Sequence, residues 1–267
     1  MHKINGVYSA ALTPINEDLS INKKLYLEHC QYLMKQGHDG LAIFGTTGEA
    51  NSFSIKEKCK AIDFLLSNNI DPQLLIPGTG SSSVEDAIQL TKFAEKHKTR
   101  AVLLQPPFYY KNVSDDGLYA SYSEIIHQVG NSKLQIYLYH IPAVSNIPLS
   151  IDLIERLIKD YPNTIVGIKD SSGDWNNTKR MLNSGWDDFR IFVGAETFLL
   201  NNMRNGGAGC ISATANVNPV AIKSLFENWD SDQAVKLQED LNKVRDVFLS
   251  FPMIPALKAA AGLYNQD

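Results

Sequence analysis

Eight short apolar runs alternate with amphipathic stretches along this chain, and this alternation constrains the fold more than any other feature. The runs are rich in β-branched residues and cover Val7–Thr13, Gly40–Gly45, Leu74–Gly78, Ala101–Gln105, Gln135–His140, Thr164–Lys169, Arg190–Gly194 and Gly209–Thr214. The stretches between them have helical spacing and include Asn22–Gln36, Ile55–Ser67, Val84–His97, Asp115–Val129, Ile151–Lys159 and Thr197–Asn205. Strands that alternate strictly with helices pair in parallel, and eight such units in about 220 residues favour a (β/α)8 TIM barrel.

An open, doubly wound sheet is the alternative arrangement for such a pattern. That fold usually has five or six strands and a glycine-rich dinucleotide fingerprint after the first, and none follows Val7–Thr13. After Pro219 the chain continues with helical patterns, Ser231–Ser250 and Ile254–Tyr264, and it has no linker rich in Pro, Gly or Ser. We therefore predict one domain, with residues 1–218 as the barrel core and 219–267 as additional C-terminal helices packed on the barrel or on a neighbour.

The composition excludes several classes of function. The 267 residues are 44% hydrophobic and carry a net charge of −4 without a basic face, so no nucleic-acid partner is expected. No apolar stretch approaches the roughly 18 residues of a membrane span. Met1–Tyr8 lacks an apolar signal core, so a cytoplasmic location is the default expectation. The three cysteines lack paired spacing and are read as reduced thiols. The six histidines are scattered and form no pair with metal-ligand spacing, so no metal is expected.

Lys169 ends an apolar, β-branched run, where an amine is costly to bury. An isolated lysine at such a position most often extends into water. In a dry pocket the amine favours its neutral form, which attacks ketones and gives a Schiff base. That intermediate is an electron sink for making or breaking a carbon–carbon bond next to a ketoacid. Lys169 is therefore the candidate nucleophile.

Active sites of (β/α)8 barrels lie at the carboxyl ends of the strands, and the unusual residues of this chain fall there. A Gly-Thr-Thr-Gly turn, Gly45–Gly48, follows the second run, and Tyr110 follows the fourth. Tyr139 lies near the end of the fifth run and Lys169 ends the sixth. A threonine pair flanked by glycines lets backbone N–H groups approach a carboxylate closely. A further segment, Gly78-Thr79-Gly80, is read as either a phosphate cradle or a shaping element of the rim.

Four segments of the chain resemble the signature segments of the dihydrodipicolinate synthase/N-acetylneuraminate lyase family. They are Gly45–Glu49, Tyr139–Pro142, Gly167–Gly173 and Gly206–Ser212. The resemblance implies a Schiff-base lyase or aldolase that joins or cleaves pyruvate and an aldehyde, with Lys169 as the Schiff-base lysine and Tyr139 as the general acid/base. It also implies no cofactor, because the covalent lysine Schiff base takes that role. Thr46, Thr47, Gly48 and Ile211 would bind the ketoacid. Thr47 is expected to orient Tyr139, and Tyr110 to complete a proton relay across a subunit interface in a homodimer or a homotetramer.

The chain departs from the family at positions that select the aldehyde. Dihydrodipicolinate synthases carry an arginine five residues after the catalytic tyrosine, and this position is Val144 here. An apolar side chain cannot replace a bidentate guanidinium. Ala195-Glu196 and Ala213 likewise differ from the sialic-acid lyase pattern. We therefore expect a sugar-acid-derived or other aldehyde in place of aspartate semialdehyde.

Three alternatives stay open at this point. The first is a 4-hydroxy-tetrahydrodipicolinate synthase of lysine biosynthesis. The second is a catalytically silent family member that binds a metabolite, because motifs can persist after chemistry is lost. The third is a phosphate-binding barrel enzyme, although the last two βα loops lack a clear phosphate nest.

Overall fold

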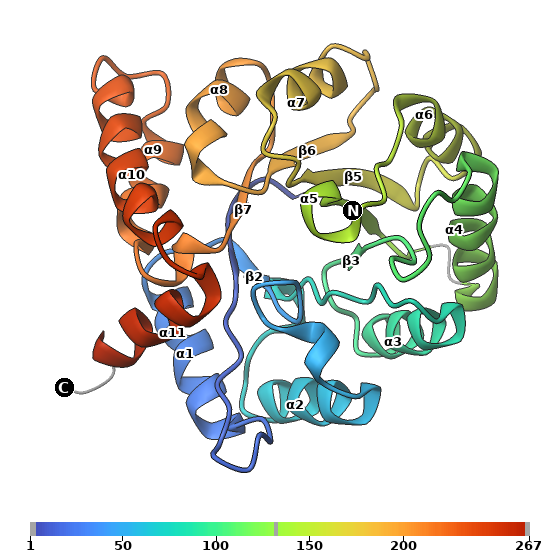
Figure 1. Cartoon of the computed structure of the whole chain (residues 1–267), viewed down its shortest axis with the longest axis horizontal. Helices are drawn as coiled ribbons and strands as arrows, with labels where there is room; N and C mark the ends of the chain where they lie inside the picture. Colours follow the sequence, from blue (N-terminus) through green and yellow to red (C-terminus); the bar gives the residue numbers. More distant parts are fainter. Residues whose placement is uncertain (1–3, 131–132, 265–267) are drawn as a thin grey trace.

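The computed structural model describes residues 4–130 and 133–264, which form a barrel of parallel strands surrounded by helices (Figure 1). Seven strands are hydrogen-bonded in the order β2-β1-β7-β6-β5-β4-β3. They are β1 (Gly6–Ala10), β2 (Gly40–Ala42), β3 (Val102–Leu104), β4 (Ile136–His140), β5 (Ile165–Asp170), β6 (Arg190–Val193) and β7 (Gly209–Ser212). The predicted (β/α)8 barrel is confirmed, with one of its eight strands replaced by a looser segment.

The prediction of a third regular strand over Leu74–Gly78 is wrong. Leu74 ends a 3₁₀ helix, and the segment makes two isolated parallel bridges, Leu75 with Leu41 and Gly78 with Leu103. Proline has no N–H and cannot donate to a ladder, so Pro77 interrupts regular pairing. Its carbonyl still accepts the N–H of Leu103 at 2.9 Å. The segment therefore fills the gap between β2 and β3 without being a continuous strand.

Helices surround the barrel because each has one apolar face that packs against the strands. They are α1 (Lys23–Lys35), α2 (Ile55–Ser67), α3 (Val84–Lys96), α4 (Asp115–Val129), α6 (Ile151–Asp160), α7 (Trp175–Leu182) and α8 (Leu199–Arg204), with the short α5 (Pro142–Ser145) after β4. Serines begin several of them, and Ser54 forms a capping box with Glu57. The predicted helix Thr197–Asn205 begins instead as a 3₁₀ helix, Glu196–Phe198, that leads into α8.

The barrel interior is packed with side chains and is not a pore. Phe192 of β6 packs edge-on against Tyr8 and Tyr137, with ring centroids 5.8 Å apart in both pairs. Gly167 of β5 is required beside them, because a Cβ at this position would lie 2.3 Å from the Tyr137 ring. Since the middle of the barrel is filled, a substrate can be bound only at its ends.

Three C-terminal helices lie together on one side of the barrel (Figure 1). They are α9 (Pro219–Glu227), α10 (Ala234–Leu249) and α11 (Met253–Tyr264). Gln238 of α10 accepts the N–H of Leu200 and donates to the carbonyl of Glu196, both at 3.0 Å, so α10 is tied to the segment after β6. Across the described ranges, no helix is both long and apolar enough to span a bilayer.

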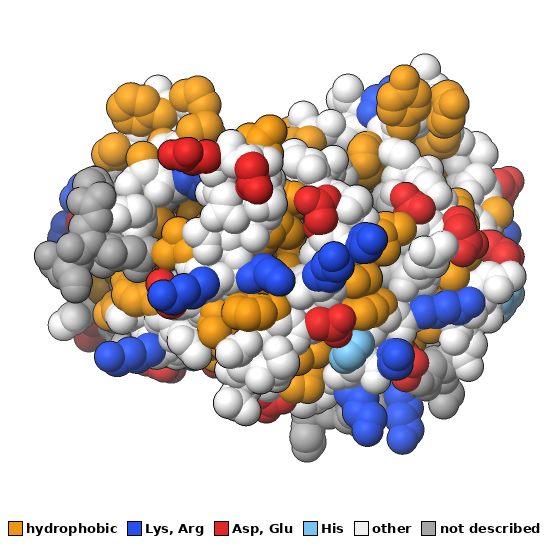
Figure 2. All heavy atoms as spheres, turned by 90° about the horizontal axis from the view of Figure 1, so that it is seen from below, with side chains coloured by type: hydrophobic (Ala, Val, Ile, Leu, Met, Phe, Trp, Pro, Cys, Tyr) orange, Lys and Arg blue, Asp and Glu red, His pale blue; other side chains and the backbone are white. Residues whose placement is uncertain are grey.

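The surface carries apolar groups as well as mixed charge. Figure 2 shows basic and acidic side chains interspersed across one side of the molecule, with hydrophobic side chains raised at two places along one edge. The exposed large hydrophobic residues include two short sets, Tyr109, Tyr110 and Val113 after β3, and Val247, Leu249 and Phe251 around the end of α10. Both sets lie uncovered in a single chain.

Candidate active site

Lys169 and Tyr139 face each other on neighbouring strands. They are register partners at the carboxyl ends of β5 and β4, and each is only 4% exposed. The Nζ atom of Lys169 lies 4.5 Å from the centroid of the Tyr139 ring. The structure therefore brings together the amine and the phenol that the sequence had placed on the same rim.

The threonine that contacts Tyr139 is Thr46, and the expectation that Thr47 orients this tyrosine is wrong. Thr46 Oγ1 lies 3.1 Å from Tyr139 Oη, so either hydroxyl can donate to the other. The backbone of the turn decides which threonine points inward. Phe44 and Glu49, on either side of the turn, both have a φ of 53°. Such left-handed torsions reverse the chain sharply, and sequence alone does not predict them.

The Gly-Thr-Thr-Gly turn is held tightly against the end of β1. Thr13 Oγ1 donates to the carbonyl of Gly48 at 2.8 Å, and a Cβ on Gly48 would lie 2.8 Å from the carbonyl oxygen of Ala11. Within the described residues, the N–H groups of Thr46, Thr47 and Gly48 have no hydrogen-bond acceptor. A turn of this kind offers several N–H donors to one anion, such as a carboxylate.

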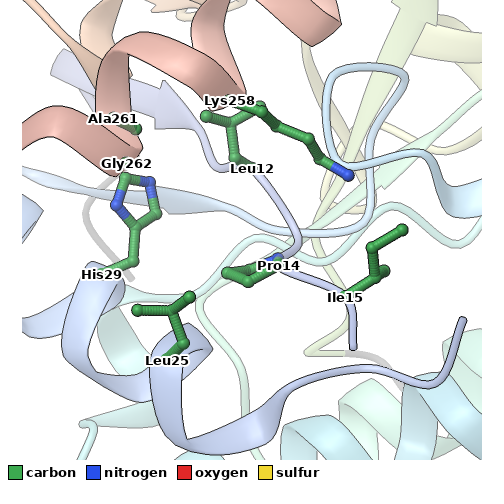
Figure 3. A pocket seen from close by; sticks show the side chains of 8 residues that line it. All are labelled: Leu12, Pro14, Ile15, Leu25, His29, Lys258, Ala261 and Gly262. Carbon is green, nitrogen blue, oxygen red and sulfur yellow. The ribbon is translucent and has the colours of Figure 1, made fainter. Parts of the chain in front are cut away.

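Glu49 closes the turn and forms an ion pair with Lys258 of α11. Figure 3 shows Lys258 extending from α11, with its amine pointing away from His29. A largely apolar cavity of 210 Å³ lies below, between α11 and the segment Leu12–Ile15. The carboxylate of Glu49 is thus paired with a cation of α11.

Close packing explains the Gly78-Thr79-Gly80 segment. A Cβ at Gly78 would lie 2.2 Å from the carbonyl oxygen of Phe44, and one at Gly80 would lie 2.6 Å from Gln105 Cβ. The hydroxyl of Thr79 accepts a hydrogen bond from Thr91 at 3.0 Å. These glycines let two segments of the rim touch, so the rim-shaping interpretation is favoured over a phosphate cradle.

Two further predicted site residues lie in different surroundings. Tyr110 is 77% exposed and packs edge-on against Tyr109, with the centroids 5.2 Å apart, so the single chain does not bring it to Tyr139. Ile211 of β7 is fully buried in the same interior cluster as Tyr139. Its side chain therefore packs in the barrel interior beside the residues of that cluster.

Glu196 belongs to a buried network that the sequence did not reveal. Its carboxylate accepts hydrogen bonds from Ser212 Oγ and Thr214 Oγ1 and pairs with Arg245 Nη1 of α10 at 2.9 Å. A carboxylate with three donors from the protein has little capacity left for a substrate. Arg245 lies 49 positions further along the chain, so no local motif could have identified this partner.

Histidine, cysteine and carboxylate side chains are the possible metal ligands of the chain. No group of three His, Cys, Asp or Glu side chains suited to a metal ion occurs in the parts of the chain that the structure describes. Cys30, Cys59 and Cys210 are free thiols, and burial raises the pKa of the Cys59 thiol above its usual value.

A closed parallel barrel with a buried strand-end lysine beside a tyrosine is typical of barrel enzymes that use a lysine amine. The pattern that defines the Dihydrodipicolinate synthetase family matches residues 3–266. The chain belongs to this family, whose members are lyases.

Solved structures of three related enzymes superimpose on the chain. A dihydrodipicolinate synthase from Agrobacterium tumefaciens is 32% identical with a TM-score of 0.90, covering 98% of this chain and 89% of that one. An N-acetylneuraminate lyase from Fusobacterium nucleatum is 29% identical with a TM-score of 0.88, covering 98% and 89%. A 2-keto 3-deoxygluconate aldolase from Picrophilus torridus is 25% identical with a TM-score of 0.88, covering 96% and 92%. These relatives have three different named activities, so similarity alone does not select a substrate.

Proposed function

We propose that the protein is a Schiff-base aldolase or lyase that uses pyruvate and an aldehyde other than aspartate semialdehyde, with a 2-keto-3-deoxy sugar acid as the favoured class of adduct. The observation that carries the proposal is the position of Lys169 Nζ 4.5 Å from the Tyr139 ring, with Thr46 hydrogen-bonded to the phenol. An amine, a proton carrier and a carboxylate-binding turn are the groups that this reaction needs.

The reaction begins when the neutral amine of Lys169 attacks the ketone carbon of pyruvate. The resulting carbinolamine loses its hydroxyl as water and becomes an imine. Loss of a proton from the methyl carbon gives an enamine, and this carbon attacks the aldehyde carbon to form the new bond. Water then hydrolyses the imine, which restores the amine and releases the product. Tyr139 gives and takes the protons in these steps, and Thr46 keeps its hydroxyl in place.

Val144 supports the choice of aldehyde. It lies in α5, directly after the strand that carries Tyr139, and is 60% exposed. The nearby ammonium of Lys111 donates to the backbone carbonyls of Phe108 and Ser145, the latter at 2.7 Å. A cation directed to two carbonyls is a poor substitute for an arginine that grips a carboxylate with both nitrogens.

We further propose that a second copy of the chain covers Tyr109, Tyr110 and Val113, and that Tyr110 reaches the partner's site. The support is the exposure of two aromatic rings, those of Tyr109 and Tyr110, because large apolar groups left in water do not stabilise a monomer. A homodimer is the smallest assembly that provides this contact, and a homotetramer would contain it twice. A cytoplasmic location also stays a proposal.

Borohydride trapping tests the chemistry. After incubation with pyruvate and borohydride, the peptide that contains Lys169 should gain the mass of a reduced pyruvyl group, and Lys169→Ala should abolish the gain without unfolding the barrel. A silent metabolite-binding member would show no adduct, and an adduct on another lysine would move the site. Efficient condensation with aspartate semialdehyde would instead favour the synthase of lysine biosynthesis.

A further inference from the structure

Behind the catalytic pair lies a second pair of side chains, His140 and Asp170, each one residue further along its strand. Tyr139 and Lys169 are register partners, and so are His140 and Asp170. Side chains alternate between the two faces of a strand, so the second pair points away from the barrel interior, toward the helices. Both side chains are buried, at 3% and 4% exposure.

His140 is held in one tautomer by its neighbours. Its Nδ1 atom lies 3.0 Å from the backbone nitrogen of Leu149. Because a backbone N–H can only donate, Nδ1 must carry the lone pair, and the single proton of the neutral ring is on Nε2. The Nε2 atom faces Asp170 Oδ1 at 4.0 Å. The ring therefore links the segment around Leu149 to the end of β5.

Asp170 fixes the other side of this link. Its Oδ1 accepts the N–H of Ser172 at 2.9 Å, and its Oδ2 accepts from Thr178 Oγ1 at 2.7 Å and from Asn177 Nδ2 at 3.1 Å. These donors belong to the loop after β5 and to the start of α7. The carboxylate thus ties that loop to the strand residue next to Lys169.

The segment anchored by His140 is the one that carries Val144. It runs from α5 to the start of α6, and its internal bonds include Ser145 Oγ to the carbonyl of Ile141 at 3.0 Å. Lys111 joins it to the segment of Tyr110 through the carbonyl of Ser145. His140 therefore connects the strand end of the catalytic tyrosine with the loop that meets the aldehyde.

We propose that His140, supported by Asp170, is a positioning residue that fixes the Val144 segment over the site and so sets the aldehyde specificity. The proposal rests on the proposed function, in which Lys169 binds pyruvate and the Val144 segment meets the aldehyde. Only the neutral ring can hold the segment, because a proton on Nδ1 would face the Leu149 N–H donor to donor.

Acid pH should therefore release the segment. Burial lowers the pKa of His140 below its usual 6.5, and the opposing influence of Asp170 is smaller. Among the described charged groups, the carboxylate of Asp170 is the one that acts on the pKa of this ring, and it raises it. As the pH falls through this lowered pKa, Nδ1 is protonated and kcat/KM for the aldehyde should decrease.

Two variants at position 140 separate positioning from simple packing. His140→Asn keeps an acceptor at the place of Nδ1 but does not titrate, so it should retain activity within about threefold and lose the acidic limb of the pH profile. His140→Leu fills the space without an acceptor and should raise KM for the aldehyde by about tenfold or more, since small misplacements near a reacting centre cost up to about a hundredfold. His97→Asn is the matched control, because His97 also faces a carboxylate, Asp63, at 3.3 Å but lies in a surface pair.

Asp170→Asn should shift the acidic limb without removing it. Without the carboxylate that raises the pKa of His140, the acidic limb should move to lower pH, whereas His140→Asn removes it.

Pyruvate trapping on Lys169 is measured in every variant. If the unmodified protein forms no adduct, the proposed function fails. If trapping is intact but His140→Leu leaves KM unchanged, or His140→Asn keeps the acidic limb, the positioning role is refuted. The melting temperature identifies variants that fail to fold.

Discussion

Replacing Thr46 by valine tests the corrected geometry of the site most directly. Valine has nearly the shape of threonine, so Thr46→Val removes one hydroxyl and the 3.1 Å hydrogen bond to Tyr139 Oη. A neutral hydrogen bond contributes about 0.5–1.5 kcal/mol to stability, so the barrel should stay folded, with a slightly lower melting temperature. The effect on catalysis should be larger, because the phenol loses the group that fixes its proton.

The expected size follows from the role of Tyr139. General acid–base catalysis contributes about 10²–10⁴-fold, and a phenol that is present but poorly oriented should lose a tenfold to hundredfold share of it. That loss corresponds to about 1.4–2.7 kcal/mol of transition-state stabilisation. We therefore expect kcat of Thr46→Val to fall by about 10- to 100-fold, with pyruvate KM within about threefold of the unmodified protein.

Thr47→Val is the matched control, since it removes the same group from the neighbouring residue. Among the described residues no hydrogen bond joins Thr47 to Tyr139, and the proposed role of Thr47 is to bind the ketoacid. Its loss should raise pyruvate KM and leave kcat within about threefold. Steady-state kinetics on both variants in the direction of condensation, with pyruvate varied and its consumption as the readout, separates the two. A large fall in kcat for Thr47→Val together with an unchanged Thr46→Val would refute this assignment.

Four other outcomes follow from the site and its supports. Tyr139→Phe should lower kcat by about 10²-fold or more while pyruvate trapping persists, and an unchanged kcat would place the proton carrier elsewhere. Val144→Arg should raise kcat/KM for aspartate semialdehyde selectively, by about 10- to 150-fold if the guanidinium recovers a charged hydrogen bond of roughly 1.5–3 kcal/mol. Arg245→Met should lower the free energy of unfolding by about 3–5 kcal/mol, because it leaves the carboxylate of Glu196 buried and unpaired; urea titration measures this loss. Mixing inactive Tyr110→Phe and Lys169→Ala chains should restore partial activity if Tyr110 acts across a subunit interface, whereas full activity of Tyr110→Phe alone would show that the tyrosine is not required.

The sequence predicted the parts of the fold that follow from the spacing of apolar residues and from the place of a residue within an apolar run. Apolar runs alternating with helical patterns led to the barrel, and a lysine at the end of such a run led to the rim. The third strand was predicted wrongly because an apolar run that contains Pro77 has the composition of a strand but lacks one donor. An apolar run can have the composition of a strand even where a proline removes an N–H, but the hydrogen-bonded ladder requires that donor.

Thr46 and Thr47 show a different limit. The two residues are identical and adjacent, so no property of the side chain distinguishes them. The selection is made by backbone torsions at Phe44 and Glu49, where the chain adopts left-handed conformations that neither residue type favours. Only the packed structure around the turn stabilises such torsions, so the correct threonine becomes evident once the barrel is assembled.

The residues that support the site could not be predicted from the sequence, because the folded structure decides their partners. Glu196 with Arg245, and His140 with the N–H of Leu149, are pairs whose partners are separated in sequence or belong to the backbone. Consecutive residues of a strand nevertheless have related roles, because one side chain faces the barrel interior and the next faces the helices. At the ends of β4 and β5 the inward residues, Tyr139 and Lys169, are the ones proposed to carry the reaction, and the next residues, His140 and Asp170, make the bonds that hold the loops. Each strand end therefore fixes a reactive group and its loop with two consecutive residues. A substitution in such a loop can change the aldehyde while the amine and the phenol stay in place, which is how one barrel can serve relatives with different named activities.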